Sequence, residues 1–264
     1  MPVDMAALAA DLAAETAVTR ALVAGLDEGG WRTPTPAVGW DIADQIGHLA
    51  YFDEAAVRSA LHPDEFRAEL AEAPQSVNPD AIAARFRDLR GEQMLAWFDA
   101  ARADLLETFA ELDPRQRLPW FGPAMSAASS LTARLMETWA HTQDIADALG
   151  VTREPAGRLR HVAHIGVGAR AFSYAVHGQT PPDTPVRVEL TAPDGTGWTW
   201  GPPEAGDRVT GSALDFCLLV TQRRHRDDLA LIIEGPAAQQ WMAIAQAFAG
   251  PPGPGRPPRG TENA

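Results

Sequence analysis

Three residues near the middle of the chain have types and spacing suited to holding a metal ion. In "RLMETWAHTQDIADALG" (134–150), Glu137 and His141 are four residues apart and Asp144 follows three residues later. Residues four apart on an α-helix project from the same face, so Glu137 and His141 can reach one cation. Asp144 lies a further turn along and could be a fourth ligand. An isolated pair of this kind is more often a surface ion pair beside a buried histidine, so the pattern needs a further residue.

A second histidine, His48, lies in the middle of the segment "DQIGHLAYFDEA" and follows Gly47, which lets another backbone or a ligand come close. The helix of Glu137 is largely apolar, and a carboxylate facing a bundle interior needs a partner to offset its desolvation. Two histidines and one carboxylate from facing helices are a common way to hold zinc or another divalent metal with positions left open. Spacing alone does not show that His48 meets the other two residues.

The composition limits the partners and the chemistry. The 264 residues include 35 Asp and Glu against 22 basic residues, for a net charge of -13. This balance argues against nucleic acid and anionic membranes as partners. We expect a small-molecule substrate and a monomer or homodimer. Every basic residue is arginine. Schiff-base chemistry on a lysine is therefore excluded.

Cys217 is the single cysteine, which excludes an intramolecular disulfide and a thiolate-cluster metal site. A bound metal would need histidine and carboxylate ligands, and we expect Cys217 to be a small buried residue. The N-terminal segment contains Asp4 and Asp11 where a secretory signal would be basic and then apolar. No apolar stretch approaches the roughly 20 residues of a membrane-spanning helix, so we expect a cytoplasmic protein.

The first 178 residues are predicted to be helical. Apolar periodicity with cap and stop signals predicts helices over residues 2–26, 41–61, 79–111, 129–149 and 156–177, and the connection after residue 61 can hold a short helix. Asp41 is expected to cap the second of these helices. The loop "LDPRQRLPWFGPAMS" contains Trp120 and Phe121, which could line a pocket or simply pack within the loop.

The remaining sequence predicts a small α+β domain over residues 179–250. The segments "VRVELTA" and "GWTWG" alternate as strands do, and "APDGTG" between them predicts a hairpin turn. A helix over 211–224, a strand in "LALIIEG" and a closing helix follow. Residues 251–264 are rich in proline and glycine, and we expect a disordered tail there.

Two of these segments carry a resemblance to a known family. "GWDIADQIGHLAYFDEAA", with its Trp-Asp pair ahead of the histidine, and the later "LMETWAHTQDIADALG" together resemble the DinB-like bundle of the mycothiol-dependent maleylpyruvate isomerase superfamily. The segment "VTGSALDFCLLVTQRR" resembles that family's C-terminal domain. The resemblance implies an α+β protein with a four-helix bundle at residues 1–178.

The resemblance also implies a site. It assigns a divalent metal, usually zinc, to His48, Glu137 and His141, and mycothiol as a cosubstrate whose thiolate occupies an open metal position. Asp144 is then better interpreted as a residue that orients His141 or a nearby helix than as a fourth ligand. Arg223 or Arg224 in "TQRRHR" matches an arginine that binds a carboxylated substrate, although a basic helix end that complements the helix dipole explains the pair equally well.

Three functions follow as hypotheses. The first is a metalloenzyme that activates mycothiol for isomerisation or S-transfer on an electrophilic metabolite. The second is a thiol-independent hydrolase, lyase or isomerase, in which the same metal activates water or polarises a carbonyl. The third is a non-catalytic protein that binds a metal or a ligand. An arginine-lined polar cleft beside the metal would favour the first, a closed apolar pocket the second, and Asp144 as a fourth ligand the third.

Overall fold

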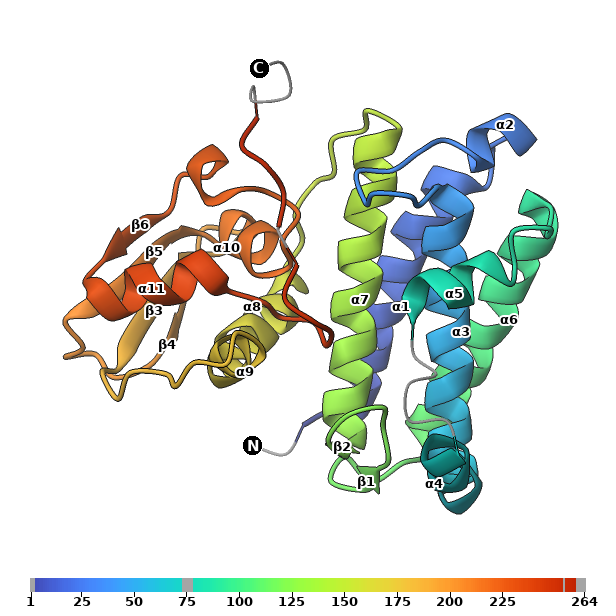
Figure 1. Cartoon of the computed structure of the whole chain (residues 1–264), viewed down its shortest axis with the longest axis horizontal. Coiled ribbons are helices and arrows are strands. Elements are labelled where there is room, and N and C mark those ends of the chain that lie inside the picture. The colour runs from blue at the N-terminus through green and yellow to red at the C-terminus, as the bar shows by residue number, and fades with distance from the viewer. Residues whose placement is uncertain (1–2, 73–77, 254, 260–264) are drawn as a thin grey trace. The chain divides into compact units, whose positions relative to one another are not determined.

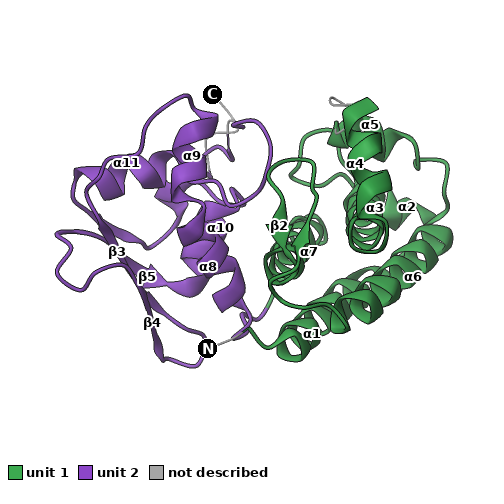
Figure 2. Ribbon diagram, turned by 90° about the horizontal axis from the view of Figure 1, so that it is seen from below, with its two compact units in different colours: residues 1–153 green, residues 154–264 purple. Residues whose placement is uncertain are grey.

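The computed structural model describes residues 3–72, 78–253 and 255–259 (Figure 1). The chain divides into two compact units, residues 1–153 and 154–264 (Figure 2). This division precedes the expected boundary at residue 178, because α8 (Leu159–Gly168) packs against α10 (Ala213–Val220) of the second unit. At Gly166 a side-chain Cβ would lie only 2.7 Å from Val220, so the contact between these two helices depends on glycine.

The first unit is a four-helix bundle. Its helices are α1 (Met5–Val23), α3 (Ile42–Leu61), α6 (Gly91–Ala110) and α7 (Ala127–Ala148). Both α1 and α3 pack against both α6 and α7, which places α3 and α7 side by side (Figure 1). Fully buried apolar side chains fill the space between them, namely Leu12, Ile46, Leu49, Phe98, Leu105, Leu131 and Leu135. Their helical spacing in each segment gives each helix the apolar face that this packing buries.

Side-chain caps fix where these helices begin. The Asp41 carboxylate accepts a hydrogen bond from the Asp44 backbone N–H, so Asp41 caps α3 as predicted. The Asp44 carboxylate in turn accepts from the Asp41 backbone N–H, which completes a capping box. At the starts of α1 and α7, the side chains of Asp4 and Ser126 each accept a hydrogen bond from a backbone N–H of the first turn. The two helices that carry the candidate ligands therefore start at positions set by local sequence.

The prediction of one continuous helix over residues 79–111 is wrong. The chain forms α5 (Pro79–Ala84), turns, and restarts as α6 at Gly91. A Cβ at Gly91 would lie 2.1 Å from Trp31 in α2 (Glu28–Trp31), so the start of α6 is fixed by a tertiary contact. The helix predicted over 156–177 is also divided, into α8 and α9 (Arg170–Val176). The short helix expected after residue 61 is α4 (Pro63–Glu72).

The loop before α7 is folded back by a two-stranded ribbon. Strand β1 (Arg117–Leu118) pairs antiparallel with β2 (Met125–Ser126). Between these strands, the rings of Trp120 and Phe121 contact Phe52 of α3 and Phe66 of α4, with centroid separations of 5.4 to 6.2 Å. The two rings therefore pack against the middle of α3 and against α4 rather than extending into solvent.

The second unit has a four-stranded sheet in the order β4-β3-β5-β6. The predicted hairpin is β3 (Val186–Thr191) with β4 (Gly197–Trp200), and the predicted later strand is β6 (Ile232–Glu234). The sequence did not predict β5 (Asp207–Ser212), which pairs parallel with β3 and antiparallel with β6. This strand includes Gly211, and its pairing partners lie outside any local hairpin, so little local signal marks it.

Helices complete the second unit. Helix α10 follows β5 directly, the short 3-10 helix η1 (Arg226–Asp228) comes next, and α11 (Pro236–Ile244) packs against β5 and β6. The buried Asp207 carboxylate accepts hydrogen bonds from the backbone N–H groups of Ala237 and Ala238, at the start of α11. The predicted α+β class is confirmed.

Part of the expected disordered tail, residues 254 and 260–264, lies outside the described residues. The described positions 251–253 and 255–259 form neither helix nor strand. The Arg259 backbone N–H donates to the Asp228 carboxylate at 3.0 Å, so this part of the tail makes a defined contact. Among the described helices, none combines the length and the apolar character needed to cross a membrane.

Candidate metal site

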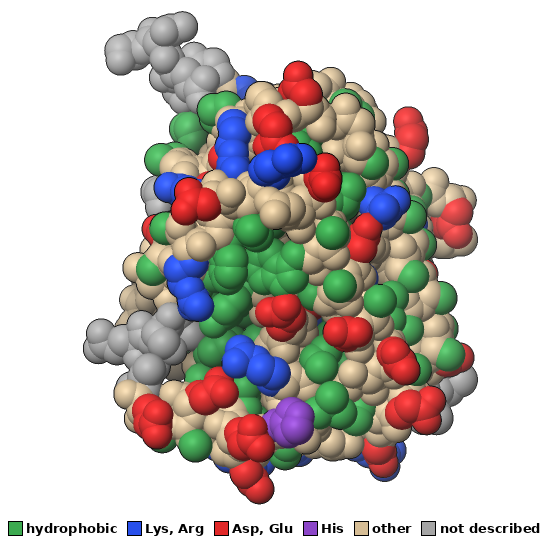
Figure 3. All heavy atoms as spheres, turned by 90° about the vertical axis from the view of Figure 1, so that its right-hand side faces the viewer, with side chains coloured by type: hydrophobic (Ala, Val, Ile, Leu, Met, Phe, Trp, Pro, Cys, Tyr) green, Lys and Arg blue, Asp and Glu red, His purple; other side chains and the backbone are tan. Residues whose placement is uncertain are grey.

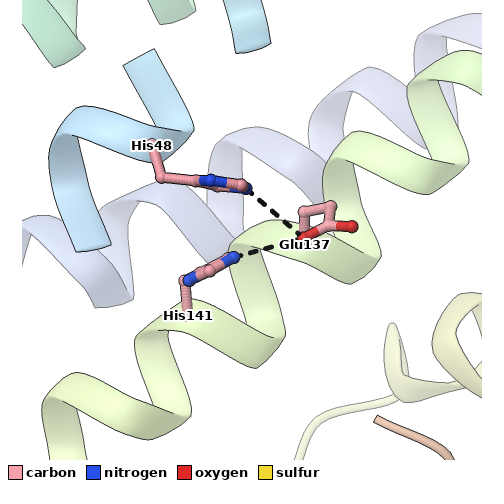
Figure 4. A group of neighbouring side chains, drawn as sticks. All are labelled: His48, Glu137 and His141. Atoms are coloured by element: carbon pink, nitrogen blue, oxygen red, sulfur yellow. Dashed lines mark ion pairs between the residues drawn. The ribbon is translucent and has the colours of Figure 1, made fainter. Parts of the chain in front are cut away.

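His48 of α3 and Glu137 and His141 of α7 converge on one another (Figure 4). His141 Nε2 lies 3.2 Å from Glu137 Oε2, and His48 Nε2 lies 3.8 Å from the same oxygen. The three potential ligand atoms lie within 4.8 Å of one another. Among the described residues, the fold thus brings together the two histidines and the carboxylate that the sequence marked as candidate ligands.

The geometry of these atoms fits a single divalent cation. Ligand bonds of about 2.0 to 2.1 Å in a tetrahedral site imply ligand atoms about 3.3 Å apart. The two separations from Glu137, 3.2 and 3.8 Å, are close to that value. The side chains of His48 and Glu137 keep 12% and 20% of their exposed surface, so water or a small ligand can approach. Two imidazoles and one carboxylate form a donor set that suits zinc.

The electrostatics favour the protonation states that a metal ion requires. Burial, reinforced by the nearby His141, lowers the pKa of His48 from 6.5 to about 4, although Glu137 opposes this shift. Burial would by itself raise the pKa of Glu137, but hydrogen bonding and charge from His141 and His48 outweigh burial and hold it well below its usual range. Near neutral pH the His48 imidazole is therefore neutral and Glu137 is ionised.

Two aromatic rings enclose the histidines. The Trp40 ring stacks on His141 with a centroid separation of 6.0 Å and an interplanar angle of 19°, and it also lies 5.4 Å from the His48 ring. Phe52, one turn beyond His48 on α3, also contacts the His48 ring, with a centroid separation of 4.6 Å. The Trp40 indole N–H donates to Asp80 at 2.7 Å, which fixes the ring. Aromatic rings are therefore close neighbours of both imidazoles.

Gln45 contacts Nδ1 of His141, the ring nitrogen that does not face Glu137. Its Oε1 atom faces His141 Nδ1 at hydrogen-bond distance, and Gln45 is fully buried one turn before His48 on α3. Asp144 is buried one turn beyond His141, and the candidate ligand cluster does not include it. The sequence predicted Asp144 as the supporting residue and missed Gln45. The only signal for Gln45 was its position three residues before a candidate ligand.

A buried ionic network lies beside the candidate ligands and was also missed. Asp53 of α3 accepts from Arg102 of α6 at 2.7 Å and from Arg134 of α7 at 2.8 Å, and all three side chains are at most 4% exposed. Arg134 also donates to the backbone carbonyl of Leu49, the residue after His48. Asp53, Arg102 and Arg134 each lie in a segment whose apolar spacing is otherwise regular. Because they are far apart in the sequence, local pattern does not show that they pair.

Arg223 and Arg224 follow α10 in the second unit. A guanidinium nitrogen of Arg223 donates to the Thr221 carbonyl and one of Arg224 donates to the Arg223 carbonyl, both at 2.6 Å. Both backbone N–H groups donate to the Leu218 carbonyl, which closes the end of the helix. Binding of a carboxylated substrate by either arginine stays a prediction.

A separate pocket opens on the face of the bundle formed by α3 and α6. Its volume is about 560 Å³. Figure 3 shows hydrophobic side chains gathered in a hollow at the centre of the view, with acidic and basic side chains around them. The lining residues do not include the candidate ligands; they are Tyr51, Glu54, Val57, Arg58, Arg85, Phe86, Ala101 and Asp104.

Comparison with known proteins places the chain in a family. Residues 12–146 match the model of the mycothiol maleylpyruvate isomerase N-terminal domain, which is half of the chain and contains His48, Glu137 and His141. The chain belongs to this family. The mycothiol maleylpyruvate isomerase resemblance predicted from the two motifs is thus confirmed. Residues 182–233 match a second model, described as wyosine base formation.

Similar proteins and solved structures cover most of the chain. Two proteins of Mycobacterium tuberculosis, uncharacterized protein Rv0036c of strain H37Rv and uncharacterized protein MT0041 of strain CDC 1551, are each 48% identical over 257 residues, covering 96% of this chain and 99% of each relative. A crystal structure of the mycothiol-dependent maleylpyruvate isomerase superposes with a TM-score of 0.60 at 16% identity, covering 89% of this chain and 96% of that one. A histidine-to-alanine mutant of it gives a TM-score of 0.59 with the same identity and coverage. The family's fold is therefore shared across both units.

Proposed function

We propose that this protein is a metal-dependent enzyme that activates mycothiol for isomerisation or S-transfer on a small electrophilic metabolite. The convergence of His48, Glu137 and His141 on one point carries the proposal. Membership of the mycothiol maleylpyruvate isomerase family supports the choice of thiol, and the shared fold with the mycothiol-dependent isomerase is consistent with it. Maleylpyruvate is the first electrophile to test.

In this proposal His48 and His141 bind a zinc ion through Nε2, and Glu137 binds it through Oε2. When bound, the cation lowers the pKa of a coordinated thiol or water and so supplies a nucleophile near neutral pH. Trp40 and Phe52 hold the imidazoles and keep bulk water from their faces. Asp144 supports α7 behind the site, and Arg223 or Arg224 binds the substrate carboxylate.

A second function is favoured by the apolar surroundings of the histidines. Aromatic rings, rather than arginine side chains, contact both imidazoles within the first unit. Apolar surroundings of this kind suit a thiol-independent hydrolase, lyase or isomerase, in which the metal would activate water or polarise a carbonyl. Such an enzyme would turn over its substrate without any added thiol.

Metal analysis is the first test. The purified protein should contain about one zinc ion per chain, and His48→Ala should lose at least about 90% of it, because the remaining two ligands cannot enclose the ion. His62→Ala is a matched control, since His62 ends the same helix with a side chain that is 58% exposed. Mass spectrometry of metals in the three proteins measures the outcome. Equal metal content in the wild type and His48→Ala would contradict the proposal.

The two candidate reactions are then separated by thiol dependence. The zinc-loaded protein is incubated with maleylpyruvate and a panel of other electrophiles, with and without mycothiol. Turnover that requires mycothiol, and that is lost in His48→Ala, would support the first function. Turnover at the same rate without any thiol would favour the second.

A further inference from the structure

The side chain of Gln45 is oriented by the loop that precedes α3. The Gln45 amide nitrogen donates to Thr35 Oγ1 at 2.8 Å. The Thr35 hydroxyl donates its only proton to the Trp40 carbonyl at 2.9 Å, so Thr35 Oγ1 can take part in the first contact only as an acceptor. The Gln45 amide therefore presents its nitrogen to Thr35 and its oxygen to His141.

This orientation selects one tautomer of His141. An amide oxygen can only accept, so the proton of a neutral His141 ring must lie on Nδ1, where it donates to Gln45 Oε1. Nε2 then carries the lone pair. In the neutral ring that lone pair faces Glu137 Oε2 at 3.2 Å, and two electron-pair donors at this distance repel unless a metal ion, or a second proton on Nε2 that is donated to Glu137, lies between them.

We propose that Gln45, held by Thr35, is a positioning residue that keeps His141 in the tautomer whose Nε2 can bind a metal ion. The inference rests on the proposed metal site and adds the chain of hydrogen bonds from the Trp40 carbonyl through Thr35 and Gln45 to His141. Gln45 itself does not touch the metal or the substrate. The full burial of Gln45 makes this chain hard to replace with water.

The experiment removes the amide oxygen that accepts from His141 Nδ1, while keeping a side chain of similar size at position 45. Gln45→Met leaves Nδ1 without an acceptor, so Glu137 becomes the best acceptor for the ring proton and draws it to Nε2. Gln45→Glu keeps an oxygen opposite Nδ1 and should rescue the tautomer. Thr35→Val removes the contact that orients the amide and disturbs the fold least, because Thr35 is partly exposed. Gln143→Met is the matched control, since this buried glutamine on α7 donates to Asp147 instead.

Two measurements are made on each full-length variant. Long-range ¹H–¹⁵N spectra of the metal-free protein at pH 8 report the His141 tautomer, and competition with a chelator reports the affinity for Zn²⁺. We expect a proton on Nδ1 in the wild type, Gln45→Glu and Gln143→Met, and a shift to Nε2 in Gln45→Met. Zinc affinity should fall by about 10- to 100-fold in Gln45→Met and change by less than about threefold in Gln143→Met.

The outcomes separate this inference from the proposed function. An unchanged tautomer and unchanged zinc affinity in Gln45→Met overturn the inference while leaving the metal site intact. If Gln45→Met does not fold, an unchanged tautomer in Thr35→Val overturns it instead. If the wild type binds no zinc, the proposed function fails, and the tautomer in the metal-free variants still decides whether Gln45 and Thr35 set it.

Discussion

At the scale of single residues, Glu137 is the side chain that both candidate histidine ligands approach. Both histidines approach the same carboxylate oxygen, and their combined effect lowers its pKa despite burial. The helical spacing of Glu137 and His141 was evident in the sequence because residues four apart share a helix face. His48 and Gln45 come from another helix, and nothing in local spacing indicates which α7 residues they meet.

Asp144 allows the ligand set to be tested at this scale. We expect Asp144→Asn to keep about one zinc ion per chain, with affinity lowered by no more than about 100-fold, because a supporting residue acts only through a ligand. Chelator competition on the wild type and the variant measures this. Complete loss of metal, as in His48→Ala, would instead identify Asp144 as a fourth ligand and favour a non-catalytic site.

Cys217 gives a second prediction at the residue scale. Burial raises the pKa of its thiol, so very little reactive thiolate forms near neutral pH. A disulfide reagent such as dithionitrobenzoate should therefore not label the native protein within minutes, and should label one thiol per chain in 6 M guanidinium. Rapid labelling of the native protein would contradict the buried position of Cys217 in α10.

At the scale of secondary-structure elements, the register of the four helices decides the site. Arg102 of α6 donates to Asp53 of α3, Thr16 of α1 and Thr138 of α7, so one guanidinium joins the whole bundle. Thr138 follows Glu137 directly in the chain. A shift of α3 along α7 would separate His48 from Glu137 and His141. The ionic network joins these two helices beside the site and therefore opposes such a shift.

Asp53→Asn tests the weight of this network. The substitution leaves two buried guanidinium groups without their shared carboxylate, and we expect the free energy of unfolding to fall by about 3–5 kcal/mol. Asp99→Asn is the control, because its pair with Arg20 is largely exposed and its loss should change the free energy of unfolding far less. Urea denaturation of the metal-free proteins compares them. A cost at Asp53 as small as that at Asp99 would show that the network does not hold the bundle.

At the scale of the whole molecule, the candidate ligands and their supports belong to one unit. His48, Glu137 and His141, together with Gln45 and Asp53, all lie within residues 1–153, which have a hydrophobic core of their own. Arg223 and Arg224 belong to the other unit. In the proposed function, metal binding and recognition of the substrate carboxylate would therefore belong to different units.

Expression of residues 1–153 alone tests this division. Because the bundle buries its own core, we expect a folded helical protein that binds Zn²⁺ with an affinity within about tenfold of the full chain. We also expect no turnover, since Arg223 and Arg224 are missing. Circular dichroism and chelator competition measure folding and affinity, with His48→Ala in the same fragment as the control. An unfolded fragment would show that the bundle needs residues 154–264.

The sequence by itself determined what local forces decide. Apolar periodicity and caps such as Asp41 located the bundle helices, the hairpin signal located β3 and β4, and the two motifs predicted the family that residues 12–146 match. These features depend on neighbours within a few residues, so a linear pattern contains them.

The tertiary structure alone decided the rest. Trp31 packing on Gly91 fixed where α6 begins within one predicted helix, and β5 formed because β3 and β6 offered it partners. Gln45 and His141 are 96 residues apart, and they meet only because α3 and α7 pack at one register. That register comes from the simultaneous packing of four helices and the charges buried between them, which no single segment contains.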